Sequence, residues 1–99
     1  MKRAVIAGYS RSPFTMARKG ELIDVKPVNM FAEVVKNLVS KTKVNPADIE
    51  DIVVGCAFQV GEQSFNIGKL TTFLSGMEIH TSGMTVDRWC GSSLSLIHI

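Results

Sequence analysis

One cysteine, Cys90, stands where an apolar run ends and a step of small residues begins. The run Met84–Trp89 is typical of a strand, and Gly91–Ser93 is typical of the start of a helix. A thiolate is the reactive form of cysteine, and the unpaired N–H groups at a helix N-terminus favour an anion. The pattern therefore indicates a nucleophilic thiol, and a buried structural cysteine is the alternative that spacing leaves open.

The polar and aromatic neighbours of Cys90 are weaker candidates. Trp89 can wall a substrate pocket, but a packed aromatic is the favoured interpretation. Asp87 and Arg88 are expected to be solvated or paired charges. Ser92 and Ser93 are interpreted as helix-start residues, since no base for a serine nucleophile is evident.

The second cysteine and the two histidines are weaker candidates for catalysis than Cys90. Cys56 lies in a wholly apolar run and is expected to be inert core. His80 precedes the strand and is expected at the surface, whereas His98 lies about 12 Å along the predicted helix from Cys90. No zinc spacing is present. A disulfide between the cysteines stays open, although reduced thiols are expected without a secretory signal.

Composition narrows the class of protein. The 99 residues are 45% hydrophobic and 20% charged, with a net charge of +2. Scattered basic residues argue against nucleic acid, and no apolar run approaches the roughly 20 residues of a membrane span. A cytoplasmic protein, or one of an organelle matrix, is expected.

The elements that must position Cys90 alternate between strand and helix. Ala4–Tyr9 reads as a buried strand, ended before Pro13. A helix follows Pro27 and stops before Asn45, whose side chain can cap a short turn over the next residues. Its apolar stripe comprises Phe31, Val34, Val35, Leu38 and Val39.

The second half of the chain repeats the alternation. Ile52–Phe58 reads as a strand covered on both faces. A helix follows with Gly76 at its C-terminus, then the strand Met84–Trp89, then a helix from Gly91. The apolar stripe of that middle helix is expected to comprise Ile67, Leu70, Phe73 and Leu74. The order β-α-β-α-β-α predicts an α/β fold with a mostly parallel sheet.

Three segments resemble the thiolase family of acyl-CoA acetyltransferases and 3-ketoacyl-CoA thiolases. The segment Thr85–Leu94, with its Asp-Arg pair, cysteine and Gly-Ser-Ser step, is similar to the family's nucleophile segment. Residues 4–14, with Arg11-Ser12-Pro13-Phe14, resemble its first strand and turn. Residues 48–55 resemble the entry to its second strand.

The resemblance implies a thiolase-like fold in which residues 1–99 form the first, incomplete part of the N-terminal domain, one half of a layered αβαβα arrangement. Cys90 is then the catalytic residue, which takes an acyl group as a thioester in thiolytic cleavage or Claisen condensation during fatty acid metabolism. Its backbone N–H helps to hold the thioester oxygen. Coenzyme A and acyl-CoA are substrates, no cofactor is bound permanently, and no metal is needed.

The chain also departs from the family. The Gly-His-Pro motif that activates the thiol and the Cys-x-Gly-x-Gly motif that supplies a second cysteine are absent from the 99 residues. We therefore expect activity from a full-length protein, a homodimer or homotetramer, and none from this chain alone. Two alternatives stay open: a condensing enzyme of the ketoacyl-synthase type, and a non-enzymatic α/β interaction domain.

Overall fold

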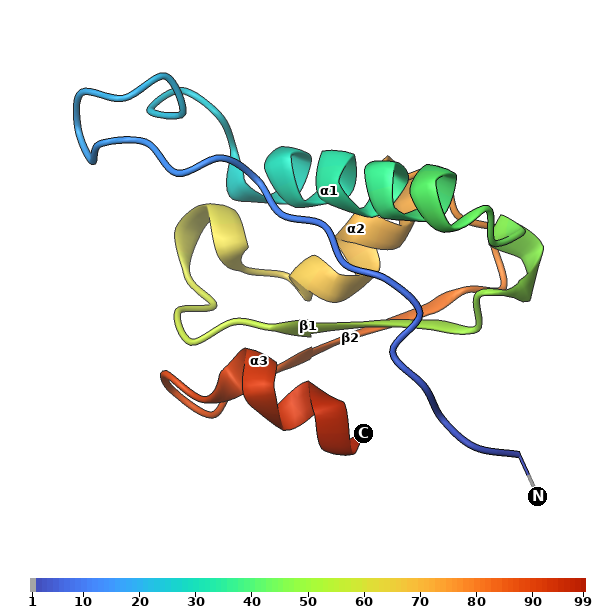
Figure 1. Ribbon diagram of the computed structural model, residues 1–99. Coiled ribbons are helices and arrows are strands. Elements are labelled where there is room, and N and C mark those ends of the chain that lie inside the picture. Colours follow the sequence, from blue (N-terminus) through green and yellow to red (C-terminus); the bar gives the residue numbers. More distant parts are fainter. Residues whose placement is uncertain (1) are drawn as a thin grey trace.

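The computed structural model describes residues 2–99, in which three helices and two strands alternate along the chain (Figure 1). The helices and strands are α1 Pro27–Thr42, β1 Asp51–Gly55, α2 Ile67–Leu74, β2 Ser82–Val86 and α3 Ser92–Ser95. Short 3₁₀ turns cover Pro46–Asp48, Gly61–Gln63 and Leu96–His98.

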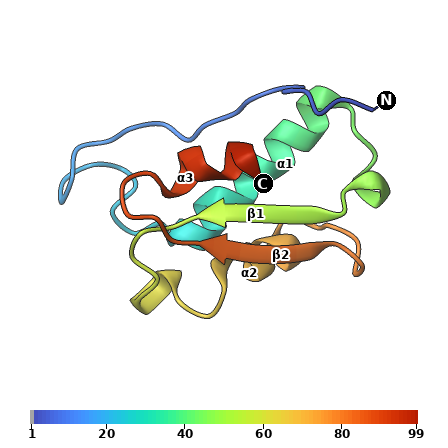
Figure 2. The same ribbon diagram turned by 90° about the horizontal axis from the view of Figure 1, so that it is seen from below.

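The two strands pair in parallel, with Val54 opposite Thr85. Helices α1 and α2 lie on one side of this pair and α3 on the other, as the two perpendicular views show (Figures 1 and 2). Val54 and Ile67 are buried between the strands and α2, and Phe31 of α1 packs against them. The predicted α/β class with a parallel sheet covered on both faces is confirmed.

Helix α1 follows the prediction closely. Pro27 occupies its first position, where the missing N–H costs nothing, and Lys43 ends it with a left-handed φ of 58°. The predicted cap is also present, since the Asn45 side chain accepts a hydrogen bond from Ala47 N at 3.1 Å. The predicted apolar stripe is half-buried throughout, and its residues are Phe31, Val34, Val35, Leu38 and Val39.

The prediction of a buried strand over Ala4–Tyr9 is wrong. This segment is extended but unpaired, and Val5 and Ile6 are 81% and 86% exposed. Its end reaches the C-terminal part of α1, where Lys41 Nζ donates to Tyr9 O at 3.3 Å (Figure 1). An apolar, β-branched run favours a strand, but a strand also needs a neighbour, and in residues 2–99 β1 and β2 pair only with each other.

The predicted second helix is confirmed as α2, but most of its apolar residues are not on its buried face. Ile67 is buried, but Leu70, Phe73 and Leu74 are 36%, 62% and 46% exposed. The buried face instead carries small and hydroxylated residues, which are Gly68, Thr71 and Thr72, with Ser75 just beyond. Among these residues, Gly68 lies where the backbone of α2 approaches β2.

Glycine makes that approach possible. A Cβ at Gly83 would lie 2.6 Å from the Cα of Lys69, and a Cβ at Gly68 would overlap the backbone of Met84. Asn66 ties the same surfaces together, because its Nδ2 donates to Gly83 O at 3.0 Å and its Oδ1 accepts from Thr85 Oγ1 at 2.8 Å. The backbones of α2 and β2 are therefore in direct contact.

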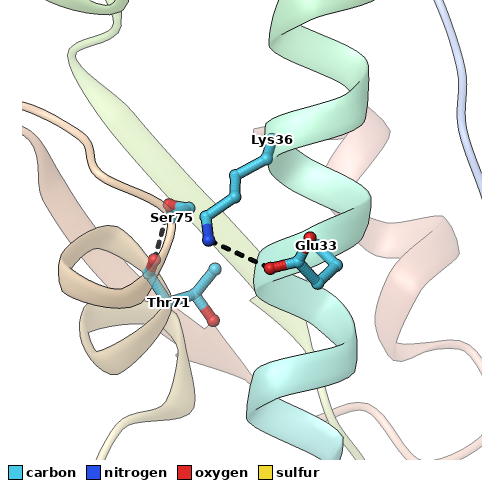
Figure 3. Close-up of polar contacts among 4 residues, drawn as sticks. All are labelled: Glu33, Lys36, Thr71 and Ser75. Atoms are coloured by element: carbon cyan, nitrogen blue, oxygen red, sulfur yellow. Dashed lines mark hydrogen bonds and ion pairs between the residues drawn. The ribbon is translucent and has the colours of Figure 1, made fainter.

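The buried hydroxyls of α2 are satisfied within the helix. Thr71 Oγ1 donates to Ile67 O at 2.8 Å, and Ser75 Oγ donates to Thr71 O at 2.6 Å (Figure 3). On α1, Lys36 pairs with Glu33 at 3.0 Å across an exposed surface, which contributes at most a few tenths of a kcal/mol (Figure 3). Both contacts lie within single helices, and Phe31 of α1 packs against the buried cluster that contains Ile67 of α2.

The strand boundaries differ modestly from the prediction. β1 ends at Gly55 instead of Phe58, although Cys56 N still donates to Val86 O at 2.9 Å. β2 begins at Ser82 and ends at Val86, so it stops before Trp89. Gly76, with a φ of 74°, ends α2 as predicted. The next residue, Met77, donates a hydrogen bond from its backbone N–H to Thr72 O at 3.1 Å.

We expect Gly68→Ala to destabilise the fold by about 2 kcal/mol. Overpacking against a rigid backbone costs up to about 3 kcal/mol, and the better helix propensity of alanine returns about 1 kcal/mol. Urea denaturation followed by circular dichroism measures the change.

Gly91→Ala is the matched control. A Cβ there would lie 3.5 Å from Arg88 O, which is an ordinary contact. Its effect should stay within about 1 kcal/mol of zero. Equal stabilities for the two variants would contradict the direct backbone contact between α2 and β2.

Candidate active site

The carboxyl ends of β1 and β2 meet at one edge of the sheet, and the segment that contains Cys90 leaves from this edge (Figure 2). Gly55 and Val86 are opposite one another at the strand ends, and the chain then reaches Cys90 four residues after Val86. In open α/β sheets, ligands bind outside the carboxyl ends of the strands. The position of Cys90 is thus one that such folds use for chemistry.

Cys90 lies between the end of β2 and the start of α3, and its side chain is exposed. Gly91 is the N-cap residue of α3, so the predicted helix start directly after the cysteine is confirmed. The alternative of a buried structural cysteine does not apply to the described chain. α3 itself is a single turn and continues as the 3₁₀ turn Leu96–His98.

Hydrogen bonds define the backbone around the thiol, in a segment that we call the Cys90 turn (Asp87–Ser92). Gly91 N donates to Arg88 O at 3.0 Å, and Ser92 N donates to Trp89 O at 3.2 Å. Ser92 Oγ donates to Trp89 O and accepts from Arg88 N, both at 2.7 Å. Asp87 Oδ1 accepts from Trp89 N at 2.9 Å.

The first turn of α3 packs directly on the end of β1. A Cβ at Gly55 would lie 2.5 Å from Ser93 N and 2.7 Å from the carbonyl carbon of Ser92. Beside this contact is a mainly apolar cavity of about 350 Å³, whose lining includes Gly55, Gln63 and Ser93. Cys90 is exposed and is not part of that lining.

Sequence reasoning was wrong about Trp89 and incomplete about Ser92. Trp89 is 74% exposed and is not a packed aromatic. Ser92 starts α3 as predicted, but it is also 4% exposed and bonded to the residues before Cys90. The available signal was the spacing of a serine three residues after Trp89, which is typical of a side chain that bonds to a local carbonyl.

The remaining candidates lie away from the thiol. His80 is exposed and its Nε2 contacts Ala47 O at 3.1 Å, at the start of β2. The five residues of β2, about 17 Å in length, separate it from the Cys90 turn. His98 is exposed at the far end of the 3₁₀ turn, and Cys56 is 9% exposed in the core, as predicted.

Among residues 2–99, no group of three or more histidine, cysteine, aspartate or glutamate side chains is arranged to hold a metal ion. Within the same residues, no helix has both the length and the apolar character needed to cross a membrane.

The family model and the similar proteins with known names all indicate one family. Residues 4–99 match the family model described as "Thiolase, N-terminal domain". A 3-ketoacyl-CoA thiolase of Shewanella frigidimarina is 37% identical over 99 residues, which are 99% of this chain and 26% of that protein. A 3-ketoacyl-CoA thiolase of Psychrobacter arcticus is 38% identical over 97 residues, which are 98% of this chain and 25% of that protein.

A solved structure shares the fold. The crystal structure of the Bacillus anthracis acetyl-CoA acetyltransferase superposes with a TM-score of 0.67 and 25% sequence identity, over 74% of this chain and 18% of that one. The chain spans about a quarter of the length of the curated relatives that it matches.

The two thiols should react at very different rates. We expect iodoacetamide to alkylate the exposed Cys90 at the rate of a solvated cysteine, and the buried Cys56 at least about tenfold more slowly, because it reacts only after local opening. Peptide mass spectrometry against time measures both rates. In concentrated urea the rates should converge, and Cys90→Ser should remove the fast phase. A Cys56 that reacts as fast as Cys90 in buffer would contradict this structure.

Proposed function

We propose a function for this chain from the premise that it belongs to the thiolase family, a family of acyltransferases. Cys90 is the nucleophile of an acyl-CoA acyltransferase, and residues 1–99 form the first part of its N-terminal domain. The observation that carries the proposal is an exposed cysteine at the strand-to-helix junction, within a chain that matches the family from residue 4 to residue 99.

The proposed reaction is acyl transfer in two steps. In the cleavage direction, Cys90 Sγ attacks the 3-carbonyl carbon of a 3-ketoacyl-CoA, and the C2–C3 bond breaks. The acyl group stays on Sγ as a thioester, and the leaving acetyl-CoA enolate takes up a proton. The thiol of coenzyme A then attacks the thioester, loses its proton to a base, and releases Cys90. Two easier steps replace one difficult step, and the reverse sequence is Claisen condensation.

The Cys90 turn supports a defined role for its backbone. The negative oxygen that develops during attack needs a hydrogen-bond donor about 3 Å away. The N–H groups of Gly91 and Ser92 already donate within the Cys90 turn. The proposal therefore assigns the oxyanion contact to the N–H of Cys90 itself.

Proton transfer is assigned to residues outside this chain. His80 lies at the opposite end of β2, and His98 lies at the far end of the turn after α3. The proposal assigns the general base to the family's Gly-His-Pro motif and the general acid to its Cys-x-Gly-x-Gly motif. The full-length protein is proposed to be a homodimer or homotetramer of the cytoplasm, and coenzyme A and acyl-CoA are its substrates.

We expect Cys90→Ser to lower the rate of acetyl-CoA release by at least about 10³-fold, because a serine hydroxyl without an adjacent base is a far weaker nucleophile. The assay uses the full-length gene product with acetoacetyl-CoA and coenzyme A. Intact-protein mass spectrometry of the quenched reaction should find one acetyl group, located on the peptide that carries Cys90.

Cys56→Ala is the matched control. It removes the other thiol, which lies in the core, and it should lower stability without removing the acetylated peptide. A Cys90→Ser protein that retains its activity would overturn the assignment of the nucleophile. Transfer of the acyl group from Cys90 to a carrier-bound malonyl acceptor, together with inactivity toward acetoacetyl-CoA, would favour the ketoacyl-synthase type of enzyme.

A further inference from the structure

Polar side chains hold both the N–H and the C=O of Trp89, the residue that precedes Cys90. Asp87 Oδ1 accepts from Trp89 N at 2.9 Å. Ser92 Oγ donates to Trp89 O at 2.7 Å and accepts from Arg88 N at 2.7 Å. The hydroxyl of Ser92 therefore uses its single proton and one lone pair within the Cys90 turn, before any substrate arrives.

The backbone that these bonds hold is an unfavourable one. Trp89 has a φ of 50°, which is a left-handed conformation that bulky residues rarely adopt. Its side chain is 74% exposed, so packing of the indole does not explain the conformation. The side chains of Asp87, which accepts from Trp89 N, and of Ser92, which donates to Trp89 O, oppose its relaxation together with the backbone bond from Ser92 N.

Ser92 is a rigid anchor for this purpose. Its side chain is 4% exposed, and the start of α3 rests on Gly55 at the end of β1. Trp89 O is thus held against the start of α3 by two donors of one residue, the hydroxyl of Ser92 at 2.7 Å and its N–H at 3.2 Å. The Trp89–Cys90 peptide plane also includes the N–H of Cys90, so a rotation of this plane turns the proposed oxyanion donor relative to the side chain of Cys90.

We infer that Ser92 is a positioning residue for acyl transfer to Cys90, with Asp87 as its weaker counterpart on the opposite end of the Trp89 residue. The inference rests on the proposed function of Cys90. Ser92 exchanges no proton with the substrate. It keeps Cys90 Sγ and Cys90 N–H in the relative orientation that attack on a carbonyl requires, where a displacement of about 1 Å can cost on the order of a hundredfold in rate.

The test compares Ser92→Ala with Ser95→Ala in the full-length gene product. Ser95 Oγ donates to Gly91 O at 3.0 Å, so the control loses a hydroxyl from the same helix without releasing Trp89. The readouts are the steady-state constants with acetoacetyl-CoA and coenzyme A, the acetylation of Cys90 in a quenched reaction, its alkylation by iodoacetamide, and the thermal midpoint.

We expect Ser92→Ala to lower kcat at least about tenfold with KM changed less than about threefold, since orientation is lost and binding is kept. Alkylation of Cys90 should be almost unchanged, because iodoacetamide needs no oriented N–H. Ser92→Thr, which retains the hydroxyl, should restore much of kcat. Asp87→Ala should lower kcat less than Ser92→Ala, and Asp87→Asn, which keeps an acceptor, should lower it least.

The outcomes separate the two proposals. Cys90 that is acetylated in Ser92→Ala at the wild-type rate, in a folded protein, would overturn the positioning role and leave the nucleophile in place. An equal loss of kcat in Ser95→Ala, or a loss that follows only the thermal midpoint across the variants, would also overturn it. Absence of acetylated Cys90 in the wild-type protein would instead overturn the proposed function, and the positioning role with it.

Discussion

Direct contact between helix backbones and strand backbones is the constraint on which the rest of this structure depends. At Gly68 and Gly83, α2 lies against β2 with no side chain between them, and at Gly55 the start of α3 lies against the end of β1. Such contacts leave no space for a methyl group, so the helices can pack this closely on the strands only where glycine occurs. The position of the Cys90 turn follows, because Ser92 belongs to the turn of α3 that rests on Gly55.

Small and hydroxylated residues fill the buried side of α2. At Gly68 the backbone of α2 lies against β2, and the other buried residues beside Ile67 are Thr71, Thr72 and Ser75. Their hydroxyls would be costly without partners, and each donates to a carbonyl of its own helix. Figure 3 shows the bond of Ser75. Among the described residues, no buried side-chain polar atom lacks a partner. Close packing is thus obtained without loss of hydrogen bonds.

The proposed site combines a buried, hydrogen-bonded serine with an exposed thiol. Ser92 is buried and bonded, whereas Cys90, two residues earlier, faces solvent. The apolar side chains of residues 4–9 and of the outer face of α2 also face solvent, and the most exposed examples are Val5, Ile6 and Phe73. These side chains stay exposed because the sheet has two strands in the described residues and is too narrow to cover them.

The sequence by itself determined what depends on neighbouring residues along the chain. Helix α1 with its proline start, the Asn45 cap, the glycine that ends α2 and the junction at Cys90 all arise from local periodicity and backbone preference. Tertiary structure alone decided which surfaces meet. The apolar segment Ala4–Tyr9 had strand character but no partner strand. The close packing of α2 depended on Gly83 of β2, which is 15 residues after Gly68 in the sequence. Trp89 was exposed, with its backbone held by Asp87 and Ser92. Burial and pairing are properties of two segments, and a pattern within one segment specifies only its half of the contact.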